Sequence, residues 1–219
     1  MTFSLLGRCN RTGMIGAAVT TSSIAVGSRC SHARAGVGAC LTQHRTDPRL
    51  GPLALDLLGR GYDAEHTLQA VLAVAPHHDW RQLAVIDAAG RTAAFTGRHV
   101  ARAKAGEAQG KDCVAIANIV RSPDIPAAMV RAFEADPGRP LALRLVDALA
   151  AGEAAGGEFV PVISAALLVA HEESFPYVDL RVDSHPNPIA DLARLWREYE
   201  PEAEAYVTRA NDPGAAPGA

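Results

Sequence analysis

The chain has 219 residues, of which 48% are hydrophobic and 21% are charged, and its formal net charge at pH 7 is −3. This length suits one large domain of mixed α and β structure with a single core. The Lys and Arg residues are scattered and form no basic stripe, which argues against a nucleic-acid partner. No apolar run approaches the roughly 18 residues of a membrane span, and the segment 3–6 is too short for a signal-peptide core, so we expect a cytoplasmic protein that binds no membrane.

The first third of the chain has the pattern of β-strands. Short apolar segments bounded by Gly, Asn and Ser predict strands over 2–8, 13–21, 23–28 and 35–42. The turn over 9–13 fits a hairpin that joins the first two. A strand that begins at residue 2 lies inside the fold from its first residue, which is unusual because chain ends fray unless they are tied down.

The rest of the chain alternates between pairs of helices and groups of strands. Helical periodicity and stop signals predict helices over 48–61, 63–75 (with Asp63 as N-cap), 125–135, 140–155 and 188–211. Apolar runs predict strands over 82–87, 91–97, 113–120, 162–170 and 177–182. Residues 1–211 are therefore expected to form a single domain, and the Gly, Pro and Ala composition of 212–219 predicts a flexible tail.

This order of elements favours a particular α+β architecture. Strict alternation of strands and helices, which would indicate a parallel sheet, is missing. Paired helices between meandering strands suit two mainly antiparallel sheets packed face to face, with helices outside each. We therefore predict a four-layer αββα sandwich, in which the inner strands are buried on both faces and so read as nearly continuous apolar runs.

Motifs for metal or nucleotide chemistry are not found. The four cysteines form no C-x-x-C pair and are expected to be reduced, mostly buried thiols (Cys9, Cys30, Cys40 and Cys113). The chain contains no phosphate-binding P-loop, no G-x-S-x-G elbow and no H-E-x-x-H motif. The densest histidine clusters, 77–79 and 183–185, fit solvated loops, although a metal-dependent hydrolase built on His185 and Asp183 is an alternative.

Thr2 is the first candidate for a catalytic residue. Methionine aminopeptidases generally process a Met-Thr start, which would leave Thr2 with a free α-amine. An α-amine of unperturbed pKa about 8 is suited to take the proton from a threonine hydroxyl near neutral pH, so one residue would supply both nucleophile and base. The structural alternative is that Thr2 is simply the first β-branched residue of a strand.

The segment from Met1 to Pro188 resembles the family catalogued as domain of unknown function 1028, whose members look like N-terminal nucleophile (Ntn) hydrolases. The resemblance is carried by seven blocks in one order: MTFS (1–4), AVG (25–27), ARAGVGA (33–39), TQ (42–43), AAFTG (93–97), SAALLV (164–169) and VDLRVD (178–183). It implies the αββα fold and an N-terminal Thr that points into a cleft between the sheets.

The resemblance also implies an oxyanion donor. In related Ntn enzymes a nearby Asn side chain or backbone N–H stabilises the oxyanion, and Asn118 matches the family's strand-borne Asn. Its other role would be to satisfy a strand end through its amide. The chain departs from the family pattern at Ala117, where Gly is usual, and at Ile163, where Gln is common. The missing polar group beside Ser164 would narrow or alter the pocket.

Four further polar residues are candidates for orienting or binding a substrate. Strand alternation places Ser4 on the same face as Thr2. Ser22 and Ser23 follow the second predicted strand, near the chain start, where they either orient the amine or serve as turn hydroxyls. Gln43, at the end of the fourth predicted strand, is a candidate to bind a substrate amide.

A charged strand near the end of the chain provides the last candidates. Asp179, Arg181 and Asp183 alternate, so all three face one side. The default interpretation is a structural ladder of ion pairs. The functional alternative is that Asp179 and Arg181 anchor a charged substrate or the Thr2 ammonium.

Together these features predict an amidohydrolase that acts on a small amide-type substrate, with Thr2 as nucleophile and its own α-amine as base. The predicted mechanism requires neither a cofactor nor a metal ion. A non-catalytic metabolite-binding protein on the same scaffold is the main alternative. A homodimer is also plausible, because the edge strands of such sandwiches need cover.

Overall fold

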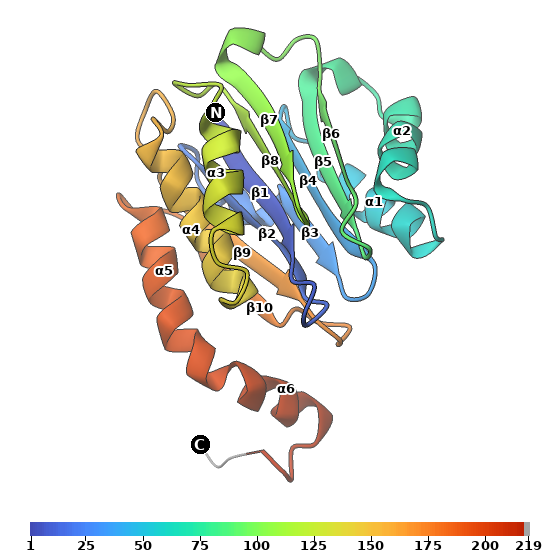
Figure 1. Ribbon diagram of the computed structural model, residues 1–219, viewed down its shortest axis with the longest axis vertical. Helices are drawn as coiled ribbons and strands as arrows, with labels where there is room; N and C mark the ends of the chain where they lie inside the picture. Colours follow the sequence, from blue (N-terminus) through green and yellow to red (C-terminus); the bar gives the residue numbers. More distant parts are fainter. Residues whose placement is uncertain (217–219) are drawn as a thin grey trace.

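The computed structural model describes residues 1–216 (Figure 1). Its strands are β1 (Thr2–Arg8), β2 (Ile15–Thr21), β3 (Ser31–Arg34), β4 (Gly38–His44), β5 (Arg81–Asp87), β6 (Thr92–Thr96), β7 (Ala105–Gly110), β8 (Cys113–Asn118), β9 (Ser164–Ala170) and β10 (Val178–Val182). Its α-helices are α1 (Leu50–Gly59), α2 (Ala64–Val74), α3 (Ile125–Glu134), α4 (Leu141–Ala154), α5 (Pro188–Tyr199) and α6 (Ala203–Asn211).

The strands form two sheets that pack face to face. One sheet has six strands in the order β10-β9-β2-β1-β8-β7, and the other has four in the order β3-β4-β5-β6. Neighbouring strands in both sheets are antiparallel. Helices α3, α4 and α5 cover the outer face of the larger sheet, and α1 and α2 cover the outer face of the smaller one (Figure 1). The predicted α+β sandwich of four layers is confirmed.

Strand β1 contributes side chains to two of the three hydrophobic clusters of the fold. Phe3 and Leu5 belong to the cluster between the larger sheet and its helices, whereas Leu6 belongs to the cluster between the two sheets. All three side chains are fully buried, and each contributes roughly 1.5–3 kcal/mol of burial free energy. A third cluster fills the space between the smaller sheet and α1 and α2. Strand alternation thus directs the even residues of β1 into the layer between the sheets.

The strand predicted over 23–28 is wrong. Ala25 has a left-handed backbone (φ 54°) and is followed by a 3-10 helix, Val26–Ser28. The segment is held by contacts to distant strands and not by a strand partner: the Ala25 N–H donates to the Asp183 carbonyl, and the Val26 N–H donates to the Ser164 hydroxyl. These tertiary contacts override the local apolar pattern.

Two edge strands, β3 and β7, carry little of the apolar pattern that predicts a strand. Their sequences are SHAR and AGEAQG, and their side chains are mostly half-buried or exposed. An edge strand pairs on one side only, so polar residues suit it. The predicted strand over 35–42 begins later, at Gly38, because residues 35–37 form the turn from β3.

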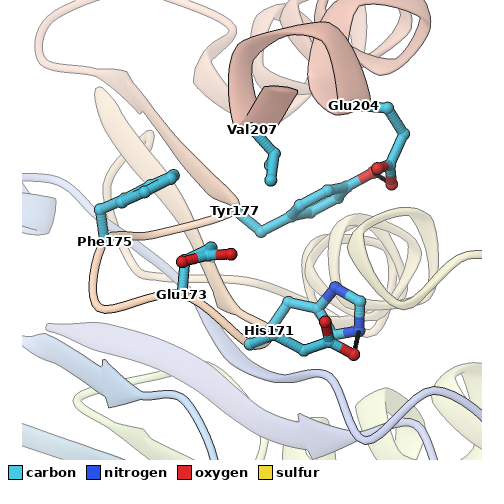
Figure 2. A pocket seen from close by; sticks show the side chains of 7 residues that line it. His171, Glu173, Phe175, Tyr177, Glu204 and Val207 are labelled. Atoms are coloured by element: carbon cyan, nitrogen blue, oxygen red, sulfur yellow. Dashed lines mark hydrogen bonds and ion pairs between the residues drawn. The ribbon is translucent and has the colours of Figure 1, made fainter. Parts of the chain in front are cut away.

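The helix predicted over 188–211 is interrupted. Pro201 lies in a short 3-10 helix, Glu200–Glu202, between α5 and α6, because proline lacks the N–H that a continuous α-helix requires. Helix α6 extends away from the sandwich (Figure 1) and is linked to it by the Tyr177 hydroxyl, which donates a 2.8 Å hydrogen bond to Glu204 (Figure 2). A cavity of about 80 Å³ lies beside this contact.

The flexible tail predicted over 212–219 can be compared with the structure only in part. Of the tail predicted over 212–219, residues 217–219 lie outside the described residues. Within residues 1–216, none of the helices combines the length and apolar character that a membrane crossing requires.

Candidate functional site

The candidate site is built on the first residue of β1. Thr2 pairs with Asn118 of β8, and the next residue, Phe3, pairs with Thr20 of β2, so the start of β1 is held on both sides in the middle of the six-stranded sheet. The even residues of β1 face the second sheet, and Thr2 is only 6% exposed. The chain start is therefore tied down inside the fold.

A network of amide side chains joins the two sheets next to Thr2. The Ser4 hydroxyl donates to Gln43 Oε1 at 2.7 Å, and Gln43 Nε2 donates to Gln82 Oε1 at 2.7 Å. Asn118 Nδ2 donates to the same Gln82 oxygen at 3.1 Å. All four side chains are completely buried. The structure therefore brings together three sequence candidates, Ser4, Gln43 and Asn118, through a fourth residue.

That fourth residue, Gln82, was not among the sequence candidates. Its Nε2 donates to the Ala117 carbonyl and to the Thr96 hydroxyl, both at 3.0 Å, so it is the centre of the network. The available signal was a polar residue at the start of an otherwise apolar strand. Its register partner on β4 is Gln43, and two buried amides in facing positions indicate a shared network.

The Met1 carbonyl group lies next to the Thr2 hydroxyl. The Met1 carbonyl oxygen accepts hydrogen bonds from the Thr2 hydroxyl and, at 2.6 Å, from the Thr21 hydroxyl. The Met1 sulfur is 4.0 Å from the Ser22 hydroxyl. Two threonine hydroxyls thus converge on the carbonyl of the peptide bond that precedes Thr2.

Three titratable side chains lie near the Met1 amine. Burial lowers the pKa of this amine, and the Glu158 carboxylate partly opposes the shift. Burial raises the pKa of Glu158 itself, which accepts a 3.0 Å hydrogen bond from the Ser22 N–H. Burial also raises the pKa of Cys30 and lowers that of His44, and both groups interact with the charge of the amine.

Glu158 is the second functional candidate that sequence reasoning missed. It is 5% exposed although it lies in the loop after α4, and its Oε1 is buried with no partner among the described residues. A hollow of about 210 Å³ opens beside it, lined also by Arg121, Glu153 and Val160. The sequence around it, Gly156-Gly157-Glu158, looks like a helix stop, and it gives no sign of a buried carboxylate.

The remaining sequence candidates lie elsewhere. The Ser23 hydroxyl is exposed and accepts a hydrogen bond from Arg29. Arg181 and Asp179 form a two-pronged ion pair with both N···O distances at 2.8 Å, on the exposed side of β10. None of these three contacts Thr2 in the described structure.

The histidine alternative has no supporting geometry in residues 1–216. Asp183 and His185 are exposed, and His185 Nδ1 accepts a hydrogen bond from the Asn187 N–H. In this part of the chain, no three His, Cys, Asp or Glu side chains gather into a possible ion site. All four cysteines are buried and free.

Comparisons with known proteins agree on the family. The model of a family of unknown function (DUF1028) matches residues 2–192. The crystal structure of protein SPO2555 from Silicibacter pomeroyi, of the same family, has 33% sequence identity over 90% of this chain and 85% of that chain, with a TM-score of 0.83. Anbu (ancestral beta-subunit) from Yersinia bercovieri has 12% identity over 93% of this chain and 97% of that chain, with a TM-score of 0.40, which is too low to establish a common fold. None of the curated proteins matches. Because the family model covers nearly the whole chain, this protein belongs to the DUF1028 family.

Proposed function

We propose that the protein is an Ntn-type hydrolase of a small amide, with Thr2 as nucleophile after Met1 is removed. The observation that carries the proposal is the convergence of the Thr2 and Thr21 hydroxyls on the Met1 carbonyl oxygen. The proposal takes the position of the residue 1 acyl group as that of a substrate acyl group. Cleavage after Met1 would free that position and create the α-amine on the same residue as the hydroxyl.

The proposed base is the Thr2 α-amine. To accept a proton near pH 7 an amine must be neutral for part of the time, so a lowered pKa favours this role. Burial already lowers the pKa of the amine one residue earlier, at Met1. Glu158 would offset this by its negative charge, so that the amine would remain able to carry the proton during the reaction.

Asn118 is the proposed oxyanion donor. It is the register partner of Thr2 on β8 and faces the same layer between the sheets. Its Nδ2 carries two N–H groups, and one of them bonds Gln82. Fixing an amide by one hydrogen bond leaves the second N–H preoriented, which is the condition for stabilising a developing negative charge.

Gln43 and Ser4 support this arrangement from the second sheet and are proposed to position Asn118 through Gln82. The hollow beside Glu158 is the proposed approach of the substrate, which we expect to be a small molecule. Asp179, Arg181 and Ser23 do not line this hollow, so the proposal assigns them no role in the reaction.

The experiment combines intact mass with activity-based capture. The mass of the purified protein reports whether Met1 is removed, and an acyl-donor panel of small amides and activated esters reports whether residue 2 is acylated. Thr2→Ala abolishes acylation in the proposed mechanism, whereas Thr2→Ser retains it. Thr92→Ala, on β6, is the matched control for loss of a threonine hydroxyl and leaves acylation unchanged.

Retention of Met1 in a protein that turns over amides overturns the free-amine mechanism. Equal turnover by wild type and Thr2→Ala excludes Thr2. Saturable binding of a metabolite with neither acylation nor turnover favours the non-catalytic alternative.

A further inference from the structure

A second candidate site lies at the opposite end of β1. A pocket of about 480 Å³ is formed by the β1–β2 hairpin, the β7–β8 turn, the end of α3 and the first turn of α4. Its lining includes four cationic residues, Arg8, Arg11, Lys111 and Arg144. At about 3.3 Å per residue, the seven-residue strand separates this end from Thr2 by roughly 20 Å. Figure 1 places the chain start and this hairpin at opposite ends of the sheet.

Arg144 is the unusual feature of this pocket. Its side chain is more than nine-tenths buried, since the residue is 6% exposed. Arginine is seldom buried unless a carboxylate neutralises it. Within residues 1–216, no carboxylate lies within ion-pair distance of Arg144, and its one side-chain hydrogen bond runs from Nε to the Phe133 carbonyl at 3.0 Å. The guanidinium carbon lies 3.8 Å from the centre of the Phe133 ring, so the guanidinium group is stacked and held in place.

The two carboxylates that line the pocket, Asp112 and Glu134, form no ion pair with Arg144. Asp112 is engaged by Arg8, with 3.0 Å between oxygen and nitrogen. Glu134 accepts a 2.6 Å hydrogen bond from the Lys111 N–H. Four cations therefore face two carboxylates, and each carboxylate already has a partner in the pocket wall.

Arg11 completes the wall on the solvent side. Its guanidinium donates a 2.8 Å hydrogen bond to the Gly138 carbonyl and so joins the β1–β2 hairpin to the loop between α3 and α4. This leaves most of its N–H groups free to bind a ligand. Arg11 and Arg144 reach the pocket from different elements, and their fixed positions suit a ligand held between two guanidinium groups.

The geometry points to a binding site for a small oxyanion, the phosphate or carboxylate group of a metabolite, held by Arg144 and Arg11. A planar guanidinium can donate two parallel hydrogen bonds to the oxygens of such a group. The bound anion would provide the ion-pair partner that Arg144 lacks within the described residues. Because the pocket is remote from Thr2, this site stands whether or not the protein is a hydrolase.

The test is calorimetric titration of the full chain with inorganic phosphate and, separately, with malonate, at constant ionic strength set by NaCl. Constant ionic strength removes the general screening effect of added salt from the comparison. We expect saturable binding of one anion per chain. Arg144→Met and Arg11→Met each weaken binding at least about tenfold, the effect of losing a charge-assisted contact. Arg131→Met, an exposed arginine of α3 outside the pocket, is the control with the same charge change and leaves the dissociation constant unaltered.

The two probes separate the possible ligand groups. Binding of phosphate alone assigns a phosphate-bearing ligand, and binding of malonate alone assigns a carboxylate. The inference is overturned if neither anion binds the wild-type chain, or if Arg11→Met binds as tightly as wild type. Circular dichroism checks the fold of each variant, and should Arg144→Met fail to fold, Arg11→Met decides the outcome because Arg11 is exposed.

Discussion

The side-chain amides of Gln43 and Gln82 face each other across neighbouring strands, with 2.7 Å between Nε2 of Gln43 and Oε1 of Gln82. Both are fully buried in the layer between the sheets. A buried amide is costly unless it is hydrogen-bonded, and this pair also bonds the larger sheet, Gln43 through the Ser4 hydroxyl and Gln82 through the Ala117 carbonyl, so it constrains how the two sheets align. The same pair also supports Asn118, which links the alignment of the sheets to the candidate site.

Gln82→Ala tests this link. The change removes the Gln82 oxygen that accepts from Gln43 Nε2 and Asn118 Nδ2 and leaves a cavity, and we expect a loss of about 2–4 kcal/mol in the free energy of unfolding. Urea denaturation measures it. The control is Gln69→Ala on the exposed face of α2, where the loss should stay within about 0.5 kcal/mol. Equal small losses in both variants would mean that the network contributes little to stability.

The Glu158→Gln variant tests the raised pKa of the buried Glu158 carboxyl through the pH dependence of stability. Burial raises the pKa of Glu158 in the folded protein. A carboxyl whose folded pKa exceeds its unfolded pKa stabilises the fold fully below the unfolded pKa, and this contribution is lost as pH rises through the folded pKa. Wild type should therefore lose stability relative to Glu158→Gln as pH increases above about 4, the ordinary pKa of a glutamate.

Urea unfolding at a series of pH values measures this difference. Glu153→Gln, an exposed glutamate on α4, is the control and should track wild type at every pH. A stability difference between wild type and Glu158→Gln that is constant with pH would contradict the raised pKa.

Cysteine alkylation should proceed in a fixed order. Burial raises the pKa of Cys40 and of Cys113 to about 12, so only ~10⁻⁴ of each would be thiolate at pH 8. For Cys9, burial acts to raise the pKa, but hydrogen bonds from Thr12 and from the backbone of residues 11 and 12 lower it overall. Cys9 also lines a pocket of about 270 Å³.

Peptide mass spectrometry after brief exposure of the native protein to iodoacetamide at pH 8 measures the order. We expect Cys9 to be modified first, and Cys40 and Cys113 to be protected until urea unfolds the chain. Modification of Cys40 in the folded protein at the rate of Cys9 would refute the order.

Two glycines, one in crowded and one in open surroundings, allow the effect of an added methyl group on stability to be compared. A Cβ at Gly16 would lie 2.3 Å from the Leu168 carbonyl oxygen on the adjacent strand, so Gly16→Ala must push two central strands apart. We expect a loss of about 2 kcal/mol or more. At Gly59, in α1, the nearest atom would be 3.6 Å away, and Gly59→Ala should be neutral or stabilise by up to about 1 kcal/mol. Thermal unfolding of both variants checks the contrast, which fails if Gly16→Ala melts like wild type.

Much of the architecture could be predicted because local and tertiary preferences agree. The predicted strand over 2–8 matches β1, and Asp63 caps α2 by accepting a 2.9 Å hydrogen bond from the His66 N–H. The resemblance to the DUF1028 family pointed to Thr2 and Asn118, which are register partners in the structure. Apolar periodicity and capping are short-range signals that a single sequence carries in full.

What could not be predicted depends on distant contacts. Glu158 is buried because its loop forms a bridge with Val120, and Arg144 is buried because the first turn of α4 packs above Phe133. In sequence, one is a loop glutamate and the other a helical arginine, both of which are usually solvated. Neither burial follows from a local pattern, and both residues belong to the sites that the structure suggests.

The position of Met1 has a practical consequence for protein preparation. The Met1 carbonyl accepts a hydrogen bond from the Thr21 hydroxyl, and the Met1 amine lies near Glu158. Residues added before Met1 would therefore have to pass these side chains to reach solvent. An affinity tag fused there would compete with the packing of β1 and would block aminopeptidase trimming. A tag at the C-terminus, after α6, leaves the surroundings of Met1 and Thr2 unchanged. Recombinant protein should therefore carry its tag there.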